Sequence, residues 1–159
     1  MTIKMYTPNE YENLSKDIHT KIEDYRDSKT ATLVGIKVLE NGEREMELLA
    51  SNGDVYQLME RAGKYPKTKN ALKNFQLVAL LTGGWAAPIK EEDEDEIAPS
   101  QHPDRIRVKM TLLGNTVNQY SSTLTFSGKD EIMYDYMNAN GSLAEGFEEL
   151  LTIWRDGDE

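Results

Sequence analysis

The side chains best suited to chemistry stand on either side of one long loop between two predicted strands. Trp85 follows paired glycines at the end of the first strand, and His102 precedes Arg105 and Arg107 at the start of the second. An indole offers a flat apolar surface, an imidazole titrates near neutral pH, and guanidinium groups bind carboxylates and phosphates well. If the two strands are neighbours in a sheet, the loop ends lie close together. These four residues would then form a pocket for a small anionic ligand.

His102 is the one weak candidate for a catalytic acid or base in that pocket. In the alternative interpretation Trp85 fills the core, prolines stiffen the loop ends, and Arg105 and Arg107 pair with acidic side chains. The loop contains no second histidine for a metal, and the sequence offers no obvious Ser–His or Cys–His arrangement. We therefore predict no metal and no cofactor, and we favour a protein that is not an enzyme.

The residues on either side of the loop also form a motif. Gly84-Trp-Ala-Ala-Pro88 precedes an acidic spacer, and Pro99-Ser-Gln-His-Pro-Asp-Arg105 leads into the second strand. Together with the helix start at Gly141-Ser-Leu-Ala144, this pattern resembles a group of uncharacterised proteins common in actinobacteria and their phages. The resemblance spans the chain from about Phe75 to Trp154. It implies an actinobacterial or phage origin and no particular function.

Within the loop, the segment from Glu91 to Glu96 is an unbroken run of carboxylates. Like charges repel one another and cannot be buried together, so we predict a solvated acidic loop over about residues 90–98. A calcium site would need ligands spaced around a turn with a glycine, which this run lacks. A surface that imitates the phosphates of DNA stays open as an alternative, because the sequence does not show how carboxylates are spread over the folded surface.

The composition disfavours several classes of protein. The 159 residues include 18 basic and 28 acidic side chains, and the net charge of −10 argues against direct binding to nucleic acids or anionic membranes. Cysteine is absent, which removes thiolate chemistry and fits a reducing compartment. The sequence also has no signal peptide and no apolar window long enough to span a membrane. We therefore expect one cytoplasmic domain over residues 1–159.

Two helices with clear start signals are predicted near the two ends of the chain. Thr7 and Glu10 form a capping box at the first, and Ser142 and Glu145 form one at the second. His19 lies beside the apolar stripe of the first helix, and we interpret it as a packed or surface residue rather than a ligand. The two apolar stripes recur at steps of three and four: Tyr11, Leu14, Ile18, Ile22 and Tyr25 in the first helix, and Leu143, Phe147, Leu150, Leu151 and Trp154 in the second.

Strands are predicted for most of the chain between these helices. Segments 30–39 and 43–50 form a hairpin around Asn41-Gly42. From Val55 to Ala62 the pattern is ambiguous: Asp54 could cap a short helix, but we favour a third strand. The lysine-rich segment 64–74 fits a solvated connection better than an anion site.

The second half of the chain continues the strand pattern. Alternation over 105–113 predicts a half-buried strand, and we expect its return strand at 117–126 to have one side in water.

These elements predict an α+β fold, in which the first and last helices pack on one face of an antiparallel sheet of about five or six strands. The sequence favours a small acidic binding or accessory protein that acts through protein–protein contacts. One alternative is a DNA mimic that inhibits a DNA-binding protein. The other is an enzyme or binder for a small anion, using the loop with Trp85, His102 and Arg105. The oligomeric state is unknown from the sequence.

Overall fold

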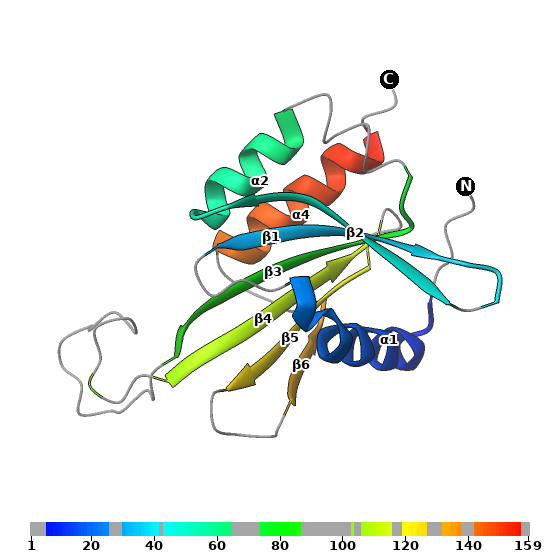
Figure 1. Ribbon diagram of the computed structural model, residues 1–159, viewed down its shortest axis with the longest axis horizontal. Helices are drawn as coiled ribbons and strands as arrows, with labels where there is room; N and C mark the ends of the chain where they lie inside the picture. Colours follow the sequence, from blue (N-terminus) through cyan, green and yellow to red (C-terminus); the bar gives the residue numbers. More distant parts are fainter. Residues whose placement is uncertain are drawn as a thin grey trace.

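The computed structural model describes residues 6–25, 30–41, 43–64, 74–86, 103, 106–115, 119–126, 132–137 and 142–156. These residues form the predicted α+β fold, with three described α-helices around one sheet (Figure 1). The helices are α1 (Pro8–Lys21), which continues into the 3-10 helix η1 (Ile22–Tyr25), α2 (Val55–Lys64) and α4 (Ser142–Asp156). The strands are β1 (Ala31–Val38), β2 (Arg44–Asn52), β3 (Leu77–Ala86), β4 (Ile106–Gly114), β5 (Tyr120–Phe126) and β6 (Ile132–Tyr136).

The six strands lie in the order β2-β1-β3-β4-β5-β6, and every neighbouring pair is antiparallel. Strands β1 and β2 form the predicted hairpin, and β3 to β6 form a meander. Between these two units the chain passes through α2, so that β2 and β3 lie on opposite sides of β1. This order makes β1, β3, β4 and β5 the interior strands of the described sheet, with β2 and β6 at its edges.

The helices cover both faces of the sheet, so the prediction that the first and last helices share one face is wrong. Helix α1 lies on one face, and α2 and α4 lie side by side on the other (Figure 1). The reason lies in β1 and β3, which bury consecutive residues rather than every second one. A strand that is apolar on both sides must be covered on both sides.

The segment from Val55 to Lys64 is also not the third strand that the sequence favoured. It forms α2, and the Asp54 carboxylate accepts hydrogen bonds from the backbone N–H groups of Tyr56 at 2.9 Å and Gln57 at 3.2 Å. Asp54 is therefore the N-cap of a short helix, which was the alternative interpretation of this segment. The buried residues Leu58, Met59 and Ala62 then fall on one side of the helix, against the sheet and α4.

The start of α1 agrees with the prediction in detail. The Thr7 hydroxyl accepts from the backbone N–H of Glu10 at 3.2 Å, and the Glu10 carboxylate accepts from the backbone N–H of Thr7 at 3.0 Å. The predicted apolar stripe faces the sheet, with Tyr11, Ile18 and Ile22 fully buried. The capping box and the stripe therefore fix where α1 begins and which side it buries.

Gly35 of β1 allows the packing of side chains on the sheet to be tested. The ring of Phe75 lies directly over it, and a Cβ atom added at Gly35 would stand 2.6 Å from Phe75 Cδ2. We predict that Gly35→Ala lowers the free energy of unfolding by about 1–3 kcal/mol, because the ring must move out of a filled core. In the control Gly53→Ala a new Cβ meets nothing within 4 Å. Its urea midpoint should stay close to that of the unmodified protein, and equal effects of the two substitutions would contradict this packing.

Candidate functional site

The structure brings two of the four predicted site residues together at the level of the backbone. Trp85 in β3 stands directly opposite Arg107 in β4, so the two parent strands are neighbours, as the pocket hypothesis requires. The Arg107 side chain is exposed. His102, Arg105 and the side chain of Trp85 lie outside the described residues, and so does the acidic run 90–98. The anion pocket therefore stays a prediction.

A layer of polar side chains lies buried between α1 and the sheet. Ser15 Oγ is 2.8 Å from Ser121 Oγ of β5. His19 Nδ1 is 2.7 Å from Thr111 Oγ1 of β4, and His19 Nε2 is 2.7 Å from Thr125 Oγ1 of β5. The expectation that one side of β5 faces water is therefore wrong. Alternation identifies the polar side of a strand, but it does not show that a helix will cover that side.

Tyrosine hydroxyls extend this polar layer. The Tyr11 hydroxyl donates to the carbonyl of Leu113 at 2.8 Å. Burial raises the pKa of Tyr11 well above its ordinary value, so this hydroxyl keeps its proton. Burial also raises the pKa of Tyr134, although its neighbours Ser15 and Ser121 act to lower it. These tyrosines therefore stay neutral near physiological pH.

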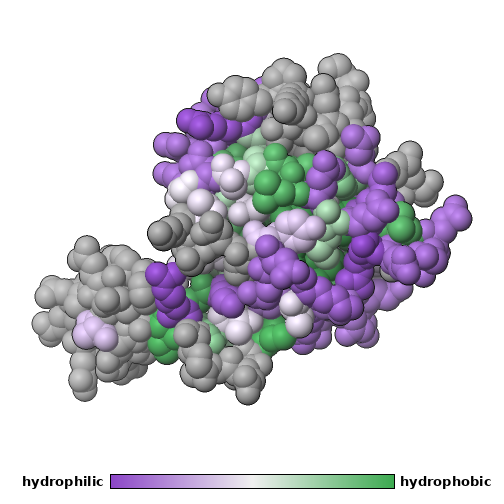
Figure 2. Space-filling view, in the orientation of Figure 1, coloured by the Kyte–Doolittle hydropathy of each residue, from purple (hydrophilic) through white to green (hydrophobic). Residues whose placement is uncertain are grey.

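The polar layer fastens α1 to the sheet and offers no access to a substrate. Ser15 is 1% exposed and His19 is 3% exposed, and both form hydrogen bonds within the protein. His19 is thus a packed residue, as the sequence analysis expected. The outward surface of α1 above this layer is largely hydrophilic (Figure 2).

The opposite face of the sheet carries an apolar groove with a volume of about 360 Å³. Its floor is formed by β3, β4 and β5, and its wall by the first turns of α2 and α4. Thr82 supplies a side-chain hydroxyl to a lining that is otherwise mostly hydrocarbon. The described lining residues are Val55, Tyr56, Thr82, Gly83, Gly84, Val108, Met110, Leu124, Phe126 and Leu143.

The groove exists because the helices cover only part of this face. Helices α2 and α4 pack over β1, β3 and the later part of β4, where Leu80 and Leu112 lie in the core. Beyond their first turns, β3 contributes Gly83 and Gly84 instead of large side chains. A Cβ atom added at Gly84 would meet nothing within 4 Å, so this residue leaves the floor of the groove open.

Apolar surface continues from the groove to the edge of the sheet. Met133 of β6 stands opposite Leu124 of β5, which places both on the groove's face, and Met133 is 50% exposed. Tyr56 at the rim is 51% exposed. Among the described residues, the elements that border this surface carry exposed acidic side chains: Asp54 directly before α2, Asp135 in β6, and Glu145 and Glu148 in α4.

The sequence contained part of the signal for this groove. Alternation correctly placed Val108 and Met110 on one face of β4, and the paired glycines marked a position without side chains. What it did not show was that α2 is a helix and that this helix begins beside these residues. Among the described residues, no group of three or more His, Asp or Glu side chains could hold a metal ion. No described helix is long and apolar enough to cross a membrane.

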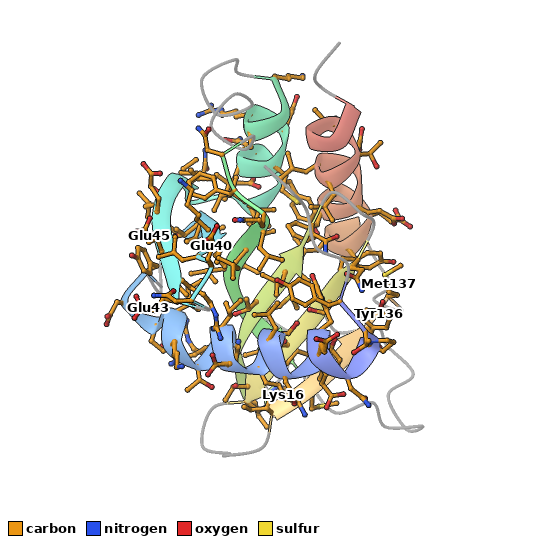
Figure 3. The ribbon with its side chains drawn as sticks, turned by 90° about the vertical axis from the view of Figure 1, so that its right-hand side faces the viewer. Lys16, Glu40, Glu43, Glu45, Tyr136 and Met137 are labelled. Atoms are coloured by element: carbon orange, nitrogen blue, oxygen red, sulfur yellow. The ribbon has the colours of Figure 1, made fainter. Side chains whose placement is uncertain are left out.

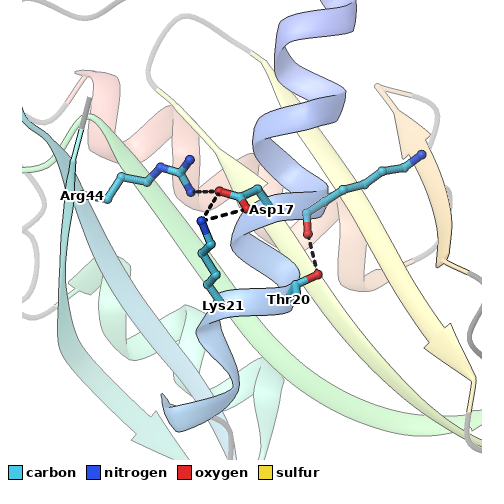
Figure 4. Close-up of polar contacts among 5 residues, drawn as sticks. Asp17, Thr20, Lys21 and Arg44 are labelled. Atoms are coloured by element: carbon cyan, nitrogen blue, oxygen red, sulfur yellow. Dashed lines mark hydrogen bonds and ion pairs between the residues drawn. The ribbon is translucent and has the colours of Figure 1, made fainter. Parts of the chain in front are cut away.

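An ion pair between α1 and β2 gives the structure a pH-dependent contact (Figure 4). Arg44 Nη1 lies 2.6 Å from Asp17 Oδ2, and Lys21 Nζ lies 3.0 Å from Asp17 Oδ1. Burial acts to raise the pKa of Asp17, but the hydrogen bonds from Lys21 and Arg44 outweigh it and hold this pKa below its ordinary value. The folded protein therefore binds this proton less tightly than the unfolded chain does.

We predict that Arg44→Gln lowers the free energy of unfolding by about 0.5–1 kcal/mol at about pH 7, a modest loss because the Asp17 side chain is 35% exposed to solvent. The stabilisation is present above the unfolded-state pKa of the carboxyl and is lost as pH falls through the lower folded-state pKa. The difference should therefore shrink as the pH is lowered through the folded-state pKa. Urea unfolding at neutral and at acidic pH measures it, with the exposed Arg61→Gln as control. A loss that is equal at both pH values would show that Arg44 acts by packing alone.

Comparisons with known proteins add neither a family nor a function to this geometry. No protein-family model, no curated protein and no solved structure matches the chain. The resemblance to actinobacterial and phage proteins therefore stays a prediction.

Proposed function

We propose that this chain is a non-enzymatic binding protein whose groove receives part of a partner protein. The observation that carries the proposal is the continuous apolar surface from the groove to Met133, with Tyr56 and Met133 each about half exposed. Apolar surface of this kind on a folded protein is typical of a binding site. The groove lining suits apolar side chains of a partner, which would leave water on binding.

The charges around the groove favour a basic partner. The elements that border the groove carry the exposed acidic residues Asp54, Asp135, Glu145 and Glu148, and the whole chain has a net charge of −10. Complementary charge speeds encounter and excludes wrong partners more than it adds affinity. A partner segment with apolar residues flanked by lysine or arginine fits both features. The proposal includes a cytoplasmic location, which rests on composition, and an actinobacterial or phage origin, which rests on the sequence motif.

Two other functions stay as candidates because a specific observation favours each. A small anion could bind near Arg107, because β3 and β4 are neighbours and Trp85 stands opposite this arginine. An inhibitor that mimics DNA would draw on the net charge of −10. Contacts made mainly by charges weaken steeply as salt rises, whereas apolar contacts respond little.

We predict that filling the groove abolishes partner binding without unfolding the protein. In Gly84→Leu the new side chain enters open space, and in Tyr56→Ser the rim loses an apolar contact. Each substitution should reduce the recovery of a cross-linked partner from lysate of the source organism by about tenfold or more. The control is Leu48→Ser, which removes an equally exposed apolar side chain, 52% exposed, from the α1 face.

The same capture at low and high salt separates the candidates. Recovery that persists in high salt and is lost in Gly84→Leu supports the groove. If recovery falls steeply in high salt and is unchanged by both groove substitutions, the result supports the DNA mimic and contradicts binding in the groove. Thermal unfolding of each variant confirms that the fold is intact.

A further inference from the structure

We propose that the partner segment binds as an additional β-strand along the outer edge of β6. This inference rests on the proposed function and specifies how the partner is held beside the groove. Among the strands that the structure describes, β6 is the last in the sheet, next to β5. An edge strand exposes backbone N–H and C=O groups, and these can pair with an extended peptide.

The two edges of the sheet differ in how well they resist such pairing. Strand β2 carries three charged residues, Arg44, Glu45 and Glu47, and its register with β1 shifts at a bulge. Charges and bulges on an edge strand hinder the addition of another strand. Strand β6 pairs with β5 in continuous register and contains one charged residue, Asp135. Chemically, β6 is therefore the more receptive edge.

The hydrogen-bond pattern shows which backbone groups of β6 point outward. The backbone N–H of Met137 donates to the carbonyl of Tyr120 at 3.1 Å, across the β5–β6 ladder. In an antiparallel ladder, hydrogen-bonded pairs alternate with pairs whose backbone groups point away. Because every second residue of β6 bonds to β5, the residues two and four positions before Met137, which are Asp135 and Met133, also bond to β5. The backbone N–H and C=O groups of Tyr134 and Tyr136 therefore point away from β5, toward the outer edge of the sheet.

The side chains of β6 determine what an added strand should look like. On the groove's face, its residues would lie beside Met133 and Asp135, which suits an apolar residue next to a lysine or arginine. On the other face they would lie beside Tyr134, whose ring is 5.9 Å from Lys16 Nζ. A segment with a β-branched residue beside Met133 and a basic residue beside Asp135 on the groove's face, and uncharged β-branched residues on the other face, meets these requirements.

The charge of the chain argues for a different protein rather than a second copy. Two copies would each bring a net charge of −10 and an Asp135 to the shared edge. Figure 3 shows Tyr136 and Met137 at one side of the molecule and Glu40, Glu43 and Glu45 at the other, on the β1–β2 hairpin. A basic strand on β6 is attracted by the whole chain, whereas an acidic copy is repelled.

The test uses the full chain labelled with ¹⁵N and a capped synthetic peptide of about seven residues, in which lysine and valine alternate along one face of the strand and threonine occupies the other. We expect saturable changes in the amide signals of β6 and slower hydrogen exchange at the amides of Tyr134 and Tyr136. Methylating alternate backbone nitrogens of the peptide removes its donors, and this should weaken binding by about tenfold or more. Met133→Lys should weaken it as well, while Leu48→Lys, which adds the same charge on the opposite face, should not.

A helical peptide of lysine and leucine with the same charge separates this inference from the proposed function. If that peptide binds more tightly, shifts the signals of Tyr56 and Gly84, and leaves the exchange of Tyr134 unchanged, strand addition is overturned and the groove function stands. Strand addition is also overturned if the methylated and unmethylated peptides bind equally, or if the alternating peptide does not bind. If the peptide binds along β6 and Gly84→Leu still captures the partner fully, the proposal that the partner binds in the groove is overturned, while strand addition on β6 is supported.

Discussion

The burial of β1 and β3 on both faces is the constraint on which the rest of the structure depends. The five residues from Leu77 to Leu81 are at most 1% exposed, although their side chains alternate between the two sides of the sheet. Such a strand is stable only between two covering layers. Helix α1 supplies one layer, and α2 with α4 supplies the other, so the short chain is organised as helix, sheet and helices.

The two layers are held by different kinds of contact. Under α1, hydroxyl and imidazole groups form specific hydrogen bonds, and each one fixes a position along the helix: Ser15 with Ser121, and His19 with Thr111 and Thr125. A buried polar group without its partner is costly, so this interface tolerates one register of α1.

On the other face, α2 and α4 are held by close packing of apolar side chains. A Cβ atom added at Gly146 would lie 2.8 Å from Met59 Cε, and one added at Gly63 would lie 3.0 Å from Ile153 Cδ1. The glycines let the two helices approach closely over β1 and β3. On this face, close packing there leaves β5, β6 and the start of β4 without a covering helix among the described elements, and the groove lies at this boundary. The surface that we propose for partner binding is thus a consequence of how the core is filled.

Much of the fold was determined by the sequence itself, through short-range chemistry. The capping box and apolar stripe of α1, the β1–β2 hairpin and the alternation at the start of β4 depend on neighbours within a few residues, and these predictions were confirmed, as was the α+β fold. Three features were decided only by tertiary structure: the helical state of α2, the burial of the polar side of β5, and the placement of α1 and α4 on opposite faces. Each depends on what a segment packs against far along the chain. Periodicity shows which side of an element is apolar or polar, but contact between distant segments determines what covers that side.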